Sequence, residues 1–169
     1  MIKTLVNFDI SEGSWLVELP MVQSLSRDVF NKVINELNPE WLQGKNLVIV
    51  NIALSNDEII RQLNAEFRNI DKPTNVLSFA NIDDEEFDAY LQRNDEIELG
   101  DIIISLNTMM EQSDEQEISL YDHYVHILIH GILHILGYDH IEKEEAAEME
   151  ELEIRLLKMF DIANPYEEN

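Results

Sequence analysis

The segment that decides this fold is SLYDHYVHILIHGILHILGYDH, residues 119–140. Its nearly continuous apolar run predicts a helix, and Ser119 with Asp122 at the third helical position is a capping pattern. His130 and His134 are four residues apart, so their side chains lie on one face of that helix, one above the other. Gly137 supplies the left-handed residue with which helices often end.

The histidines of this segment predict a metal site. Gly137 lets the chain turn back, so that His140 approaches the point where His130 and His134 meet. Three imidazoles with the fourth position open form the ligand set of a catalytic zinc. The alternative is a pair of core histidines satisfied by hydrogen bonds, but five histidines fall within eighteen residues. We therefore predict His130, His134 and His140 as ligands of one Zn²⁺ per chain, although nickel and copper also suit nitrogen ligands.

His126 competes for a place in this ligand set, because it also lies four residues from His130. Four residues of helix rise about 6 Å, which separates His126 from His134 by about 12 Å. Two nitrogens that each lie about 2.1 Å from a zinc ion cannot be so far apart. We therefore expect His126 and His123 to be neighbours of the site or surface residues.

The spacing H-x-x-x-H-x-x-G-x-x-H is also that of metzincin peptidases, which place a glutamate directly after the first histidine as general base. Gly131 occupies that position here, and glycine offers no group that reaches a water molecule. Peptidase chemistry of this type is therefore disfavoured. Gly131 serves either close packing against a neighbouring element or room for a bulky substrate.

The chain of 169 residues fits one domain, and we predict a single metal-dependent hydrolase domain over residues 1–169. The pattern predicts strands at residues 2–8, 14–18, 47–54, 76–79 and 102–104, with residues 47–54 buried on both faces. Helices are expected at residues 22–37, from the capping sequence at residues 55–58, after Ser119, and at about residues 142–160. Residues 81–99 are acidic and aperiodic, which indicates a long loop. This order suggests an α+β fold with a mixed sheet and helices packed on it.

The charge is distributed very unevenly. The net charge is −24, of which residues 1–80 carry −3 and residues 81–169 carry −21. The acidic runs at residues 83–98 and 142–153 are expected to be solvated surface, while basic residues gather between Arg27 and Lys72. A polyanion is thus received on one side only, with binding that weakens as salt rises. Cysteine is absent, and neither a signal peptide nor a membrane span is visible, so we expect a cytoplasmic protein.

Residues 130–140 resemble the signature of the bacterial YbeY endoribonuclease family, the rRNA maturation factors. The likeness extends over three further segments, from about residue 48 to the C-terminus: residues 63–79 around Arg68 and the run KPTNVLSF, Leu99-Gly100-Asp101-Ile102, and residues 148–153. The resemblance implies a mixed four-stranded sheet flanked by helices. It also implies a zinc-dependent, single-strand-specific endoribonuclease that acts in rRNA processing, namely 16S rRNA 3′ end maturation, and in ribosome quality control.

The resemblance further points to Arg68 as the catalytic cation, since its fork suits phosphate. From the sequence alone, a surface arginine at a helix end is an equal alternative. Asp101 and Asp139 are either partners of ligand histidines or turn residues. The expected partners are single-stranded RNA, chiefly rRNA, and the ribosome or its small-subunit assembly factors, with neither DNA nor a membrane among them.

Two other functions compete with the endoribonuclease. One is a metallohydrolase acting on a peptide or small molecule, which Gly131 disfavours. The other is a non-catalytic ribosome-assembly factor with a structural zinc. Structural zinc sites usually fill all four positions with protein ligands, and no fourth ligand is evident in this sequence.

Overall fold

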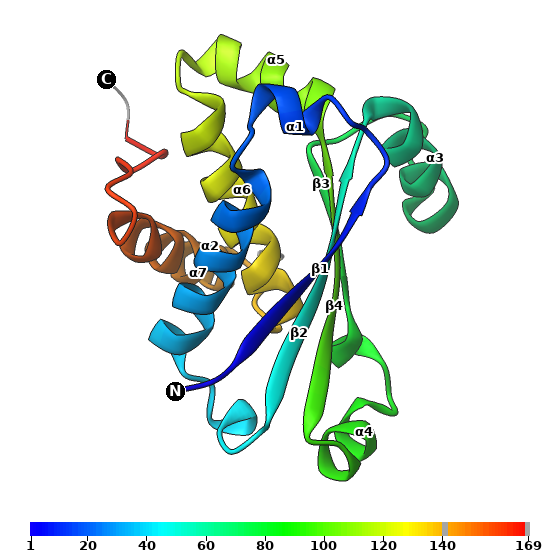
Figure 1. Ribbon diagram of the computed structural model, residues 1–169, viewed down its shortest axis with the longest axis vertical. Coiled ribbons are helices and arrows are strands. Elements are labelled where there is room, and N and C mark those ends of the chain that lie inside the picture. The colour runs from blue at the N-terminus through cyan, green and yellow to red at the C-terminus, as the bar shows by residue number, and fades with distance from the viewer. Residues whose placement is uncertain (140–141, 168–169) are drawn as a thin grey trace.

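A four-stranded mixed sheet forms the centre of the molecule (Figure 1). The computed structural model describes residues 1–139 and 142–167. The strands are β1 (Thr4–Ile10), β2 (Leu47–Ser55), β3 (Val76–Ala80) and β4 (Glu96–Ser105), and they lie in the order β1-β2-β4-β3. Strand β2 pairs in parallel with both β1 and β4, whereas β3 is antiparallel to β4. The predicted α+β fold with a four-stranded mixed sheet flanked by helices is confirmed.

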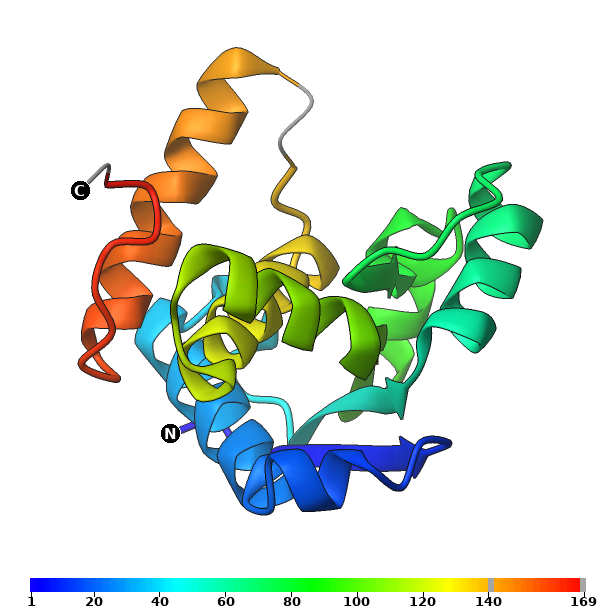
Figure 2. The same cartoon turned by 90° about the horizontal axis from the view of Figure 1, so that it is seen from above.

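Helices cover the two faces of the sheet unequally. The helices are α1 (Trp15–Glu18), α2 (Val22–Leu37), α3 (Asp57–Arg68), α4 (Phe87–Arg93), α5 (Leu106–Gln116), α6 (Leu120–Ile135) and α7 (Lys143–Lys158), with 3₁₀ turns η1 (Glu40–Leu42) and η2 (Asn81–Asp83). On one face, α2 packs on β1 and α6 packs on β3 and β4, while α7 packs on the outside of α6 (Figure 2). On the other face lies α3. In the described residues, no helix is both long and apolar enough to cross a membrane.

Strand β4 explains how one sheet serves two cores. Successive side chains of a strand point to opposite faces. Ile102 and Ile104 therefore enter the main core on the α2 and α6 side, while Ile103 joins Ile60 and Leu77 under α3. The continuous apolar run of β4 is the pattern of a strand covered on both faces.

Strand β2 differs from the prediction of burial on both faces. Val48, Val50, Ile52 and Leu54 are buried against the helices. The alternate residues Leu47, Ile49, Asn51 and Ala53 are only half-buried, and Asn51 and Ala53 line an open cavity on the other face of the sheet. Because α3 lies against β3 and β4, it leaves this part of β2 uncovered.

Two further predictions about local structure are wrong. Residues 14–18 are not extended but contain α1, because Trp15 is fully buried and its indole N–H donates to the Ser55 carbonyl at 2.9 Å. The acidic segment 81–99 is not one loop. It contains η2 and α4, where Phe87 packs edge-on against Trp41, and the first residues of β4. Buried Ile97 and Leu99 alternate there with exposed glutamates, a period of two that signals a strand.

The capping of α3 is shifted by one residue from the predicted box. Asn56, rather than Ser55, is the N-cap, and its side chain accepts from the Ile59 N–H at 3.0 Å. Ser55 instead completes β2. Helix α5 was not predicted.

A bulge interrupts the pairing of β2 with β4. Ile49 pairs with Glu98 but Val50 pairs with Gly100, so one residue of β4 is extra. Gly100 has φ +145°, and a Cβ placed there would lie 2.1 Å from the Phe79 carbonyl oxygen. Only glycine therefore allows β3 to pair with β4 beside the bulge.

We expect Gly100→Ala to lower the free energy of unfolding by about 3 kcal/mol, because it combines backbone strain with a steric clash. Urea denaturation of the purified variant measures this loss. The matched control is Gly13→Ala, since a Cβ at Gly13 meets no atom within 4 Å, and its stability should stay within about 0.5 kcal/mol of the original chain. Equal stabilities for the two variants would contradict this account of the bulge.

Candidate functional site

Helix α6 carries two of the three predicted ligands, and its ends agree with the prediction. Ser119 is the N-cap, and its hydroxyl accepts from the Asp122 N–H at 3.0 Å. At the other end, Gly137 has φ +100°, and its N–H donates to the His134 carbonyl at 3.0 Å. The N–H of Tyr138 reaches the Leu133 carbonyl, also at 3.0 Å, as in a Schellman motif.

His130 and His134 converge as their spacing predicts. Their Nε2 atoms are 3.0 Å apart, and the ring centroids are 4.5 Å apart with the planes at 80°. Two nitrogens bound to one zinc at the tetrahedral angle would be about 3.4 Å apart, so these two rings fit a shared metal ion. His140 lies outside the described residues. Among those that are described, no set of three histidine, cysteine or acidic side chains is placed to hold a metal, and the three-histidine set stays a prediction.

A buried carboxylate orients His130. Glu153 of α7 is only 1% exposed, and its Oε1 lies 2.6 Å from His130 Nδ1. A carboxylate only accepts, so the proton between them belongs to Nδ1, and Nε2 keeps its lone pair toward His134. This is the arrangement in which a histidine binds a metal through Nε2 while an outer carboxylate fixes the ring.

Glu153 was missed by the sequence reasoning, which placed residues 142–153 on a solvated face. A signal was present: Met149, Leu156 and Leu157 are four residues before, three after and four after Glu153, so it shares their apolar face. These three residues are buried. A glutamate at such a position needs hydrogen-bond partners.

The surroundings of Glu153 keep it ionised. Burial alone would raise the pKa of Glu153, but His126, His130 and Tyr166, which face it, outweigh burial and lower the pKa to about 2. The Tyr166 hydroxyl donates to Glu153 Oε2 at 2.5 Å, and burial followed by this bond raises the pKa of Tyr166. The α6–α7 contact therefore contains a stable anion at neutral pH.

The two histidines open on a cavity of about 450 Å³ that distant parts of the chain enclose. Arg68 comes from the end of α3, Asn75 from the residue before β3, and Val76 to Ser78 from the start of β3. Asp83 comes from η2, and Gly137, Tyr138 and Asp139 come from the segment after α6. The cavity thus brings the KPTNVLSF run, residues 72–79, beside His130 and His134, which follow that run by about fifty residues in the sequence.

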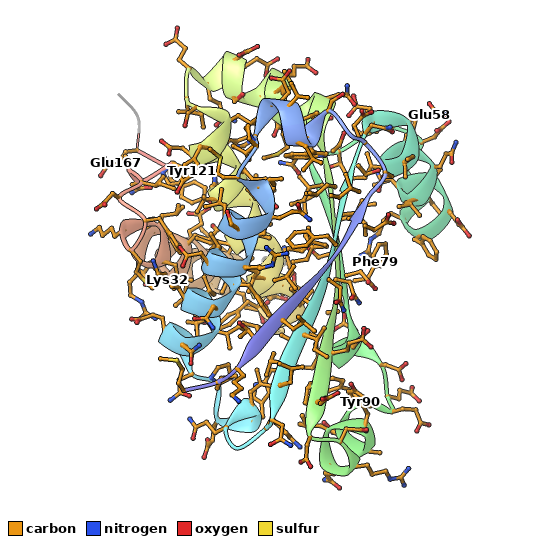
Figure 3. All side chains as sticks on the ribbon, in the orientation of Figure 1. Lys32, Glu58, Phe79, Tyr90, Tyr121 and Glu167 are labelled. Atoms are coloured by element: carbon orange, nitrogen blue, oxygen red, sulfur yellow. The ribbon has the colours of Figure 1, made fainter. Side chains whose placement is uncertain are left out.

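Arg68 is fixed at the rim of this cavity. One guanidinium nitrogen donates to the Ser78 carbonyl at 3.0 Å, and the group lies over the Phe79 ring at 5.0 Å. The Phe79 side chain projects toward the α3 side of the sheet (Figure 3) and packs edge-on against Phe67. No carboxylate of the described residues forms an ion pair with Arg68, so its charge is available to an anion.

Gly131 faces the sheet rather than the cavity. A Cβ on Gly131 would lie 3.1 Å from Ile102 Cγ2 and 3.3 Å from Ser78 Oγ. These contacts support the close-packing alternative, because α6 approaches β3 and β4 through this position. The structure gives no support to the alternative that Gly131 makes room for a substrate.

The two candidate aspartates, Asp101 and Asp139, line different cavities. Asp139 lines the histidine cavity. Asp101 lines another cavity of about 570 Å³, on the opposite face of the sheet, together with Phe8, Phe67 and Phe79. The described lining of that larger cavity contains no histidine, so its size does not make it the reactive site.

His123 and His126 lie outside the cavity that His130 and His134 line. His123 is buried, and its Nε2 lies 2.8 Å from Gln112 Oε1, which also accepts from the Asn75 amide at 3.1 Å. His126 Nε2 lies 3.3 Å from the Tyr166 hydroxyl. Neither residue is among the groups that line the cavity with His130 and His134.

The sequence is similar to proteins of one family along most of its length. Residues 16–161 match the family model described as Endoribonuclease YbeY. A curated Endoribonuclease YbeY from Paramagnetospirillum magneticum is 45% identical over 122 residues, which are 72% of this chain and 73% of that protein. One from Sphingopyxis alaskensis is 43% identical over 121 residues, 71% and 72% of the two chains. One from Francisella tularensis subsp. novicida is 46% identical over 120 residues, 69% and 70%.

A solved structure shares the fold. The solution structure of a protein from Thermotoga maritima matches with a TM-score of 0.52 and 23% sequence identity, covering 97% of this chain and 100% of that chain. At this identity the likeness establishes the architecture alone.

Burial of the His123 ring predicts how the free energy of unfolding depends on pH. Burial, and then the charge of His126, lower the pKa of His123 from 6.5 to about 4, and among the described residues its Nδ1 has no hydrogen-bond partner. Between pH 6.5 and 4 the unfolded chain therefore binds a proton that the folded chain does not. The free energy of unfolding should fall by about 3 kcal/mol over this window from His123 alone.

Urea denaturation at several pH values, compared with His123→Leu, isolates this contribution from that of the carboxylates. The variant should be less stable at pH 7 but lose less stability on acidification. An NMR titration of the His123 ring with a midpoint near 6.5, or equal pH dependence of the two proteins, would contradict the prediction.

Proposed function

The chain is a member of the YbeY endoribonuclease family, and we propose that it is a zinc-dependent endoribonuclease that cuts single-stranded RNA. The whole of residues 1–169 acts as one metal-dependent hydrolase domain. Its substrate is rRNA, in maturation of the 16S rRNA 3′ end and in ribosome quality control. Its partners are the ribosome or small-subunit assembly factors, and it works in the cytoplasm.

The observation that carries this proposal is the meeting of two groups in one cavity. The Nε2 atoms of His130 and His134 converge to 3.0 Å, and the wall of the same cavity holds the guanidinium of Arg68. A pair of neutral nitrogen donors suits a divalent cation, and an arginine suits a phosphate. Their juxtaposition favours a phosphodiester over a peptide as the substrate.

His130, His134 and His140 are the proposed metal ligands. Nitrogen donors without thiolate, in a chain that lacks cysteine, suit zinc with one position left for substrate. A zinc ion bound there supplies positive charge that polarises a phosphoryl oxygen and activates water. Glu153 holds the His130 ring in place, and close packing of Gly131 holds α6 against the sheet.

Arg68 is the proposed catalytic residue that binds the scissile phosphate. The Ser78 carbonyl and the Phe79 ring hold its guanidinium, and its remaining N–H groups are donors for the non-bridging oxygens. Because the group is already held, little side-chain entropy is lost when the phosphate binds. Negative charge that develops on those oxygens is stabilised where the arginine stands.

The shape and charge of the protein favour unpaired RNA. A cavity of about 450 Å³ admits a phosphodiester and its flanking groups, whereas a regular duplex keeps its backbone on a rigid helix outside it. With a net charge of −24, most of the surface repels the RNA backbone. Binding is therefore confined to the neighbourhood of Arg68 and falls as salt rises.

We expect His130→Ala and Arg68→Ala each to reduce cleavage of a single-stranded RNA by at least about 100-fold, because one removes a metal ligand and the other a charge at the phosphate. Gel assays with a fluorescent oligoribonucleotide measure the rate, and circular dichroism checks the fold. Arg93→Ala is the matched control, since Arg93 is an exposed arginine in the last turn of a helix, as Arg68 is, but does not line the cavity. Its activity should be unchanged.

The same assay separates the alternatives. A non-catalytic ribosome-assembly factor would show no cleavage by the original chain, while His130→Ala would still co-sediment with ribosomes. A hydrolase of peptides would cleave casein and spare RNA. Either outcome would overturn the endoribonuclease proposal.

Metal removal gives a second test. Dialysis against a zinc chelator should abolish RNA cleavage, and one equivalent of Zn²⁺ should restore it, because the three imidazoles alone cannot supply the positive charge. Native mass spectrometry should find one zinc per chain and none in His130→Ala. Full activity in a metal-free preparation would contradict zinc dependence.

A further inference from the structure

The carboxylate of Glu153 has two oxygens, and both are used. Oε1 accepts from His130 Nδ1 at 2.6 Å, while Oε2 accepts from the Tyr166 hydroxyl at 2.5 Å. A carboxylate that is 1% exposed is stable only when such donors replace water. The orientation of this carboxylate is therefore set from two sides: by α6, and by the segment that follows α7.

That segment is built to return to Glu153. Asp161 has φ +58°, and the Ile162 N–H donates to the Leu157 carbonyl at 3.1 Å, which ends the helix and reverses the chain. The Ile162 side chain is 8% exposed and belongs to the main core. Figure 2 shows the chain after this reversal running back beside α7.

An asparagine turn then aims Tyr166. The Tyr166 N–H donates to Asn164 Oδ1 at 2.8 Å, and Pro165 between them restricts the backbone, as in Asx-Pro turns. The Tyr166 ring packs edge-on against His126, with centroids 5.6 Å apart and planes at 88°. Backbone, side-chain and ring contacts together hold the Tyr166 hydroxyl against Glu153.

The direction of each hydrogen bond follows from chemistry. Glu153 only accepts, so the Tyr166 hydroxyl donates its one proton to Glu153 Oε2. His126 Nε2 lies 3.3 Å from that hydroxyl and 3.7 Å from Glu153 Oε1, so its N–H is the donor to the Tyr166 oxygen and also faces the carboxylate. The result is a directed chain from His126 through Tyr166 to Glu153, and such chains strengthen their members.

We propose that Tyr166 is a positioning residue for the metal site: its hydroxyl holds the Glu153 carboxylate in the orientation that fixes the Nδ1–H form of His130. This inference rests on the proposed function, because it takes His130 Nε2 as a ligand. The residue touches neither metal nor substrate, and it acts through Glu153. The C-terminal segment 162–167 is therefore part of the metal site.

Tyr166→Phe is the decisive variant, because it deletes the hydroxyl and keeps the ring against His126. We expect zinc affinity, measured by competition with a chromophoric chelator, to fall about 3- to 10-fold, below the 10- to 100-fold typical of direct outer partners. In the metal-free protein, ¹⁵N NMR of the histidine rings should show a smaller share of the Nδ1–H form at His130. Tyr121→Phe, an exposed tyrosine at the start of α6, is the matched control and should change neither measurement.

A double-mutant comparison tests whether Tyr166 acts through Glu153. In a Glu153→Gln background, Tyr166→Phe should cause little further loss of zinc affinity, because the carboxylate that it positions is gone. Equal losses in both backgrounds would overturn the inference. So would an unchanged zinc affinity together with an unchanged His130 ring form in Tyr166→Phe. If the original chain bound no zinc, or bound it equally well with His130→Ala, the proposed function would fail as well.

Discussion

Burial of α6 is the constraint on which the rest of this structure depends. The helix lies between the sheet, α2, α5 and α7, and ten of its sixteen residues are buried. Close approach to β3 and β4 is possible because Gly131 has no side chain there. His130 and His134 are only half-buried, and they line the cavity that α6 leaves open. The two imidazoles are therefore held by the core of the protein and not by a surface loop.

Much of this arrangement was predictable because it depends on local spacing. The i, i+4 placement of His130 and His134 and the glycine at residue 137 define the helix and its end without reference to the remaining chain. The pattern of Leu47 to Leu54 likewise predicted β2. The resemblance carried by the segment around Arg68 placed that residue near the histidines, and the cavity contains all three.

What the sequence did not predict depends on contacts between distant residues. Trp15 turns a short segment into α1 by packing into the core, and Phe87 does the same for α4 by meeting Trp41. The extent to which α3 covers β2 is likewise a matter of packing. Glu153 and Tyr166 belong to this class, since the residues that they contact lie in other elements of the fold. Only the folded chain brings Glu153 to His130 and Tyr166 to Glu153.

The anion beneath His130 has an electronic consequence for the proposed enzyme. A carboxylate that accepts the Nδ1 proton makes the imidazole more basic at Nε2, which strengthens its bond to a cation. The same donation of electron density weakens the cation as a Lewis acid. A more basic His130 imidazole therefore holds the metal ion more firmly but leaves it a weaker activator of the substrate. The guanidinium of Arg68, on the facing wall of the cavity, adds a positive charge that this donation of electron density does not reduce.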